Sequence, residues 1–323
     1  MLRHSVWIDG QDGENALNMR EYNKWTDHLP AGLRMRRLAA TIWAELSFPQ
    51  GACPGHFYSP IPQRDEIERD QARIFRNDLA LVPEVDNQES AQLELLARLA
   101  AQARSLDIPN QVTPGRRYHS DNSYFFRADA LVLASMLLEF KPRQYLEIGS
   151  GFSSALALDV NDARLGGSVQ FSFIEPSPER LLKLISQKDG QSARIYERRV
   201  QEVPDEVFSS LERNDFLFVD GSHVAKVGSD LNDLLFRILP LLKPGVIIHF
   251  HDICWPFEYS QESVLTGCSW NEAYFLRAFL ANNSKYQIMF FPSWLEHGHA
   301  AKWHEAFSGL KDIKASSLWI RKN

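Results

Sequence analysis

Two carboxylates and two imidazoles follow two predicted strands of this 323-residue chain. Asp220 and His223 come directly after one apolar run. His251 and Asp252 come at the end of the next apolar run. Because the carboxyl ends of parallel strands meet at one edge of a sheet, we expect these four side chains to converge on one cleft. Acids and imidazoles are the groups that proteins use to bind cations and to move protons.

Asp220 and Asp252 are the predicted metal ligands, because a hard cation such as Mg²⁺ takes oxygen donors. Such a cation would lie against a substrate hydroxyl and lower its pKa. His251 or His223 would then remove the proton, so all four side chains are candidate catalytic residues. Structural roles are the alternative: each histidine can stabilise a turn through a hydrogen bond, and Asp220 can cap one.

A glycine-containing turn comes earlier in the chain. Residues 145–154 read as an apolar strand, a turn through Gly149 and Gly151, and a helix that begins with small residues. The glycines let the backbone turn tightly and approach a ligand, while free amides at the helix start favour a carboxylate or a phosphate. An ordinary corner between a strand and a helix is the alternative.

A second predicted strand leads directly into an acid, Glu175. An acid at this position is suited to accept hydrogen bonds from ribose hydroxyls, which favours a cofactor that contains adenosine. Ser154 stands where the dinucleotide fingerprint has its third glycine. The missing glycine counts against a nicotinamide cofactor.

The elements that must position these residues alternate between helical and strand patterns from Asn122 onward, which is typical of a parallel sheet covered by helices. Apolar stripes predict helices over 89–104, 128–140 and 231–242. Seven strands are predicted, over 144–148, 169–174, 193–200, 215–219, 246–250, 286–291 and 316–321. The predicted fold is α/β, with a doubly wound, Rossmann-like sheet. Residues 1–112 are predicted to form a mainly helical extension or cap, and residues 113–323 the catalytic domain.

Composition restricts the partners and the location. A hydrophobic content of 44% is enough to form a substantial core, and a net charge of −6 gives no reason to expect nucleic acid as a partner. No apolar run approaches the roughly 20 residues needed to cross a bilayer, and residues 1–11 lack the apolar segment of a signal peptide. The 3 cysteines are widely spaced and predict no disulfide framework. We expect a cytoplasmic protein without a membrane partner.

Four features together resemble class I S-adenosylmethionine-dependent methyltransferases, particularly the small-molecule O-methyltransferase-like group that includes macrocin O-methyltransferase. They are Glu147-x-Gly149-x-Gly151, Glu175, the run from Phe218 to His223, and Phe250-His251-Asp252. The resemblance covers about residues 122–323. It implies a seven-stranded sheet whose last strand is antiparallel.

The resemblance also implies a reaction and a cofactor site. The reaction would be transfer of a methyl group from S-adenosylmethionine to a small-molecule acceptor, such as a sugar hydroxyl, with or without Mg²⁺. Glu147, Gly149 and Gly151 would surround the methionine part of the cofactor. Glu175 would bind the ribose, and Gln201 would lie near the adenine. The full set of predicted cofactor contacts is Glu147, Gly149, Ser150, Gly151, Ser153, Glu175, Gln201 and Asp220.

Further expectations concern the acceptor, the assembly and rival functions. The aromatic and acidic segments 255–259 and 270–274 are expected to shape an acceptor pocket. A homodimer is expected for a protein of this class. Two alternative functions remain: a dinucleotide-dependent oxidoreductase, and a protein that binds S-adenosylmethionine without catalysis.

Overall fold

The computed structural model describes residues 55–76, 81–307 and 315–323, and the single residues 32, 35 and 39. Contacts divide the chain into two compact units. The first comprises Met1–Ile74 and Leu265–Ser269, and its helix α3 spans Arg64–Ile74. The second comprises Phe75–Val264 and Trp270–Asn323 and contains the entire sheet.

A seven-stranded sheet in the order β3-β2-β1-β4-β5-β7-β6 forms the centre of the second unit. The strands are β1 (Gln144–Ile148), β2 (Gln170–Ile174), β3 (Arg194–Tyr196), β4 (Phe216–Val219), β5 (Ile247–His251), β6 (Tyr286–Phe290) and β7 (Ser317–Lys322). Strands β1 to β5 are parallel, whereas β7 runs antiparallel to both β5 and β6. The predicted fold class, a mostly parallel sheet with an antiparallel last strand, is confirmed.

Strands β1, β4 and β5 lie at the centre of the sheet, and their residues are almost entirely buried. Strands covered on both faces need apolar side chains in succession, which explains runs such as Phe216–Val219. The predicted strand over 193–200 is shorter in the structure. Strand β3 ends at Tyr196, and the short 3₁₀-helix η1 (Val200–Glu202) follows.

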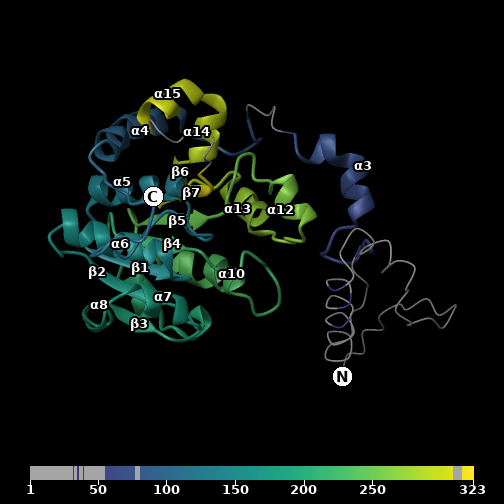
Figure 1. The fold of residues 1–323 in the computed structure, drawn as a ribbon. Helices are drawn as coiled ribbons and strands as arrows, with labels where there is room; N and C mark the ends of the chain where they lie inside the picture. Colours follow the sequence, from purple (N-terminus) through teal and green to yellow (C-terminus); the bar gives the residue numbers. More distant parts are fainter. Residues whose placement is uncertain (1–31, 33–34, 36–38, 40–54, 77–80, 308–314) are drawn as a thin grey trace. The chain divides into compact units, whose positions relative to one another are not determined.

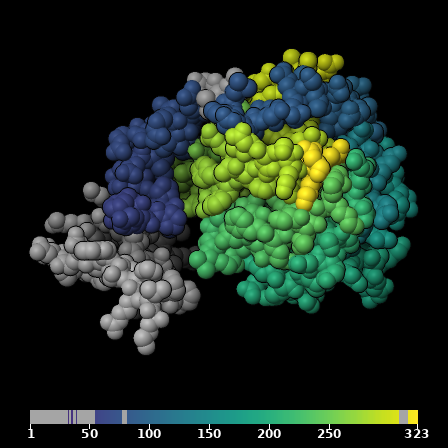
Figure 2. Space-filling model, turned by 180° about the vertical axis from the view of Figure 1, so that it is seen from behind, coloured from purple at the N-terminus to yellow at the C-terminus, as the bar shows by residue number. Residues whose placement is uncertain are grey.

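Helices α4 (Glu89–Ala103), α5 (Arg127–Phe140) and α6 (Phe152–Arg164) pack in succession, α4 against α5 and α5 against α6. The leucines of the predicted stripe on α4 are buried, and Arg98 on α4 pairs with Glu139 on α5 at 2.7 Å. Helix α4 also contacts α15 (Ala300–Ala306), so segments far apart in the sequence lie side by side (Figures 1 and 2). The domain boundary expected between residues 112 and 113 stays a prediction. A boundary there would assign α4 to a different domain from α5 and α15, the helices that it contacts.

The crossover helix predicted over 231–242 contains a π-helical turn. Helix α10 (Asp230–Asp233) continues into the π-helical turn η2 (Leu234–Ile238) and then into α11 (Leu239–Leu241). Pro240 has no amide hydrogen to donate to the carbonyl one turn earlier, so the regular α-helical ladder cannot continue there. The π-helical turn ends at Ile238, two residues before this proline.

Shorter helices complete the second unit. They are α7 (Glu179–Leu184), α8 (Gln187–Ser192), α9 (Asp205–Ser209), α12 (Gln261–Leu265, whose last residue belongs to the first unit), α13 (Glu272–Leu280) and α14 (Pro292–Gly298). In the part of the chain that the structure describes, no helix is both long enough and apolar enough to cross a membrane.

Arg117 anchors the segment that leads into α5. Its guanidinium pairs with Asp159 and Asp162 on α6 at 2.8 and 2.7 Å, and with Asp189 on α8 at 2.6 Å. Burial opposes ionisation of Asp189, but the hydrogen bonds from Arg117 and Ser186 lower its pKa to about 2. The segment after Arg117 is therefore fixed against α6, beside the glycine turn.

Candidate active site

The turn after β1 requires glycine at position 149. Gly149 has φ 82°, and a Cβ atom there would lie 1.8 Å from the carbonyl oxygen of Asp220. The amide of Asp220 in turn donates a 2.9 Å hydrogen bond to the carbonyl of Ile148. The glycine turn and the first residue after β4 are therefore in direct backbone contact.

Glu147 is fully buried on β1 and connects this strand to the first turn of α6. Its Oε1 accepts a hydrogen bond from Ser153, and its Oε2 accepts one from Ser154 at 2.5 Å. Ser154 Oγ also accepts a hydrogen bond from the amide of Gly151 at 3.1 Å. Burial raises the pKa of Glu147 to about 8, against the effect of both serines. Both carboxylate oxygens of Glu147 thus serve the turn itself.

Glu175 bridges the loops after β1 and β2. Its Oε2 accepts a hydrogen bond from the amide of Ser150 at 3.2 Å, and its Oε1 accepts one from the amide of Ser177 at 2.9 Å. Each carboxylate oxygen can accept a further hydrogen bond, so Glu175 keeps acceptor capacity for a ligand. Ser150 Oγ is buried and has no hydrogen-bond partner among the described residues.

A cavity lies between η1 and the loop after β4. Val200 lines one side, and Gly221, Ser222 and Asp230 are among the residues on the other. Gln201 Nε2 donates a 2.9 Å hydrogen bond to the carbonyl of Gly228, which connects η1 to the same loop. The segment predicted to lie near an adenine therefore borders a space at the edge of the sheet that carries the glycine turn.

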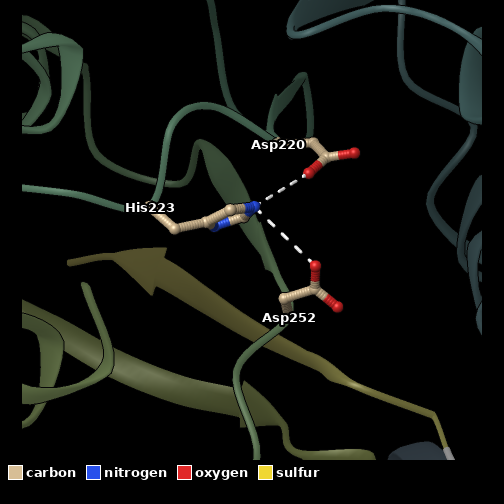
Figure 3. A group of neighbouring side chains, drawn as sticks. All are labelled: Asp220, His223 and Asp252. Carbon is tan, nitrogen blue, oxygen red and sulfur yellow. Dashed lines mark ion pairs between the residues drawn. The ribbon is translucent and has the colours of Figure 1, made fainter. Parts of the chain in front are cut away.

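The structure brings together Asp220, His223 and Asp252, as Figure 3 shows. His223 Nε2 lies 3.4 Å from Asp220 Oδ1 and 3.7 Å from Asp252 Oδ2. The potential ligand atoms of the three residues all lie within 4.8 Å of one another. On the other side of the ring, His223 Nδ1 lies 2.7 Å from Oε2 of Glu272, which is buried.

In this cluster the acids favour the protonated form of His223, and the histidines favour the ionised form of Asp220. Burial disfavours a charged His223, but hydrogen bonds with Asp220 and Glu272 outweigh it and raise the pKa of His223 to about 10. Burial likewise opposes ionisation of Asp220, yet His251 and His223 lower its pKa below the usual value. At neutral pH the cluster thus holds an imidazolium between carboxylates. A cation bound by these carboxylates would compete with the proton on His223.

His251 lies at the end of β5, deeper than His223. Its Nε2 is 3.8 Å from Asp252 Oδ1, and its buried Nδ1 has no hydrogen-bond partner in the described part of the chain. Burial disfavours a charged ring, but Asp220 and Asp252 raise the pKa of His251. Asp252 Oδ1 also accepts a 3.2 Å hydrogen bond from Ser316, just before β7.

Two buried acids beside the cluster are not among the predicted catalytic, cofactor-binding or metal-binding residues. Glu272 belongs to the segment expected to shape an acceptor pocket, but its contact with His223 joins residues that are 49 positions apart. Asp129 lies inside the apolar helix α5, and burial raises its pKa to about 6. An acid among the apolar residues of a helix is a signal that sequence inspection can find. The sequence gives no comparable indication that Glu272 contacts His223.

Aromatic residues of both predicted acceptor segments lie near the cluster. The Trp270 ring is 4.4 Å from the His223 ring, measured between centroids. Tyr259 Oη accepts a 3.0 Å hydrogen bond from the amide of Ala273, which holds the two segments together. Trp255 and Tyr259 are buried, whereas Trp270 is partly exposed beside His223.

Comparisons with known proteins identify the class of protein that this fold and site define. Residues 146–253 match the family described as a methyltransferase domain, and this range contains the glycine turn and the cluster of Asp220, His223 and Asp252. A protein of Archaeoglobus fulgidus described as uncharacterized is 33% identical over 167 residues, which cover 50% of this chain and 74% of that protein. The chain belongs to the class I S-adenosylmethionine-dependent methyltransferase superfamily.

The solved structures that are distantly similar to this chain include two methyltransferases. Methyltransferase PaMTH1 of Podospora anserina, bound to S-adenosylhomocysteine, is 15% identical with a TM-score of 0.41, covering 85% of this chain and 100% of that one. The O-methyltransferase TomG of Streptomyces achromogenes, in complex with S-adenosylmethionine, is 14% identical with a TM-score of 0.37, covering 80% and 96%. Neither similarity identifies the acceptor of this chain.

Proposed function

We propose that this protein binds S-adenosylmethionine at the turn 149–151 and transfers the methyl group to a hydroxyl of a small molecule. The observation that carries the proposal is the backbone contact between Gly149 and Asp220. It brings the turn 149–151, which is the proposed cofactor site, next to a cluster of acids and imidazoles. When bound, S-adenosylmethionine supplies an electrophilic methyl group on a sulfonium.

The residues around the turn suit this cofactor. Glu175 retains lone pairs for the ribose hydroxyls, and the orphaned Ser150 Oγ offers a polar contact near the methionine part. Val200 lines a small cavity, and in this proposal the adenine lies near the neighbouring Gln201. Glu147 holds Ser153 and Ser154, and through them the turn, in position. Alignment of the two reactants accounts for much of the expected rate enhancement.

The cluster after β4 and β5 faces the acceptor in this proposal. Asp220 and Asp252 fit a divalent cation, whose charge would lower the pKa of an acceptor hydroxyl. An imidazole in the same set departs from the all-oxygen ligation that Mg²⁺ prefers. His223 and His251 are the candidates to receive the hydroxyl proton, each only when its own proton has been lost, because the pKa of both rings is raised.

The acceptor class comes from the resemblance to the macrocin O-methyltransferase-like group, which makes a sugar hydroxyl the first acceptor to test. The flat face of Trp270 beside His223 is compatible with the apolar face of a sugar ring. A homodimer, a cytoplasmic location and the lack of a nucleic-acid partner stay predictions. Binding of S-adenosylmethionine without catalysis is the competing hypothesis.

The first test is calorimetric titration with S-adenosylhomocysteine. We expect the wild type to bind, and Glu175→Ala to bind at least about 10-fold more weakly, because a charged acceptor for the ribose is lost. Glu179→Ala removes an exposed acid four residues away on α7 and is expected to bind like the wild type. The titration is repeated with and without Mg²⁺, because a cation beside Asp220 would alter the measured affinity.

Failure of the wild type to bind S-adenosylhomocysteine in either condition would contradict the proposed function. Binding without turnover of any sugar, phenol or amine acceptor would favour the non-catalytic hypothesis. Turnover of phenols or amines, with none of sugars, would contradict the acceptor class alone.

A further inference from the structure

Arg180 lies directly over the glycine turn. A Cβ atom at position 151 would be 3.2 Å from Arg180 Cδ and 4.0 Å from its Nη1. Arg180 is the second residue of α7, the helix that follows Glu175 and β2. Its side chain therefore extends from the ribose side of the predicted cofactor site back across the turn.

Tyr124 holds the guanidinium from one face. The Arg180 Cζ atom lies 3.7 Å from the centroid of the Tyr124 ring, a distance at which a cation and an aromatic face attract each other. The Tyr124 ring stacks in turn on Phe152, the first residue of α6, with a centroid separation of 5.9 Å and an angle of 12° between planes. Arg180, Tyr124 and Phe152 thus form one stack beside the turn.

The loop that carries Tyr124 is itself fixed. Asn122 Oδ1 accepts hydrogen bonds from the amides of Tyr124 and Phe125 at 2.9 and 2.8 Å. Tyr118 Oη donates to the carbonyl of Phe125 at 2.8 Å, and the neighbouring Arg117 is anchored on α6 and α8. These contacts fix the loop that carries Tyr124, and the ring of Tyr124 in turn contacts the guanidinium.

The donors of this guanidinium have no acceptor within the described part of the protein. Among the described residues, Arg180 forms no ion pair and no side-chain hydrogen bond, although it is held in place by Tyr124. A guanidinium presents a planar fork of N–H donors that matches the two oxygens of a carboxylate. An unpaired fork beside the glycine turn points to an anionic group on the ligand.

We propose that Arg180 binds the carboxylate of the amino-acid part of S-adenosylmethionine, with Tyr124 holding the guanidinium in place. This inference rests on the proposed function, which puts the methionine part at the turn 149–151. The carboxylate is the only anionic group of that molecule. Arg180 therefore selects cofactors that carry the complete amino acid over those that lack its carboxylate.

The test compares two ligands that differ only in this group: S-adenosylhomocysteine and its decarboxylated form, which keeps the amine. We expect Arg180→Ala to weaken binding of S-adenosylhomocysteine by about 10- to 100-fold, the range for a lost charge-assisted hydrogen bond to a carboxylate. Binding of the decarboxylated ligand should not change. Lys183→Ala removes the same charge from an exposed position on the same helix and should leave both affinities unchanged.

Three further variants address the role of Tyr124 and separate the loss of the charge from misfolding. Tyr124→Phe keeps the ring and should bind both ligands as the wild type does. Tyr124→Ala should weaken binding of S-adenosylhomocysteine but not binding of its decarboxylated form. Arg180→Gln keeps a polar side chain without the charge and should give the same ligand-selective loss as Arg180→Ala. Thermal unfolding confirms that each variant is folded before it is titrated.

Equal losses for both ligands in Arg180→Ala and Arg180→Gln would overturn the inference, because the side chain would then act through packing alone. Unchanged binding of S-adenosylhomocysteine in both variants would overturn it as well. Each of these outcomes requires that the wild type binds S-adenosylhomocysteine. A wild type that binds neither ligand would instead contradict the proposed function.

Discussion

At the scale of single residues, His223 is the most constrained group of the site. Carboxylates face it from three elements: Asp220 after β4, Asp252 after β5 and Glu272 at the start of α13. The shortest of these contacts is with Glu272, at 2.7 Å. Glu272 is also the most deeply buried of the three acids, so its charge is the least screened by water.

We expect Glu272→Gln to lower the pKa of His223 from about 10 by roughly one unit or more, because the charge that favours the imidazolium is lost. Titration of the histidine ring by NMR measures this shift. Glu305→Gln changes an exposed acid and should leave the pKa of His223 unchanged.

The same shift predicts how stability depends on pH. The pKa of His223 is raised from 6.5 to about 10 in the folded protein, so protonated His223 stabilises the folded state. This stabilisation is fully present below pH 6.5 and is lost as the pH rises to about 10. The free energy of unfolding should therefore fall less over this range in Glu272→Gln than in the wild type. Parallel pH profiles of the two proteins would contradict the assigned role of Glu272.

The sequence predicts the site residues that directly follow strands, but it does not predict Glu272 and Arg180, which lie on helices. Asp220 and Asp252 could be placed together because strand ends in a parallel sheet share an edge. The contact between Glu272 and His223 depends on the path of the loop after β5, which no local pattern encodes. Arg180 shows the same limit, since its place on α7 does not reveal where its side chain points.

At the scale of elements, the sequence predicts which segments form strands more reliably than it predicts where each strand ends. All seven predicted strands form, because runs of buried apolar residues bounded by turn residues have few alternatives in a sheet covered on both faces. Strand β3 is shorter than predicted because it pairs with β2 over only three residues. The π-helical turn before Pro240 escapes prediction, since an apolar stripe looks the same for a helix with or without it.

The turn between β1 and α6 offers a direct test of one element junction. We expect Gly149→Ala to destabilise the protein by more than about 3 kcal/mol, because left-handed strain adds to a clash with the Asp220 carbonyl. Gly167→Ala is the matched control, because Gly167 also has positive φ but no atom lies within 4 Å of the Cβ that alanine would add. It should cost only about 1–2 kcal/mol. Urea unfolding measures both changes, and equal losses would contradict the role of the Asp220 contact.

At the scale of the molecule, the second unit contains the complete sheet and the candidate site. We expect a fragment of residues 75–323 to fold cooperatively. A fragment of residues 113–323 lacks α4 and exposes the surface that Leu95, Leu96 and Leu99 cover, which should cost at least about 5 kcal/mol. Circular dichroism and denaturant unfolding compare the two fragments. Equal stability would support the boundary predicted at 112/113.

The place of β7 in the sheet has a consequence for biosynthesis. Among the residues that the structure describes, strand β6 pairs with β7 alone, and β7 lies between β6 and β5 although it follows both in the sequence. On the ribosome, the parallel strands β1 to β5 can therefore associate while the nascent chain is still growing. Strand β6 must wait until β7 has emerged from the exit tunnel. Until then the open edge of β5 is exposed, and an exposed strand edge can pair with other chains.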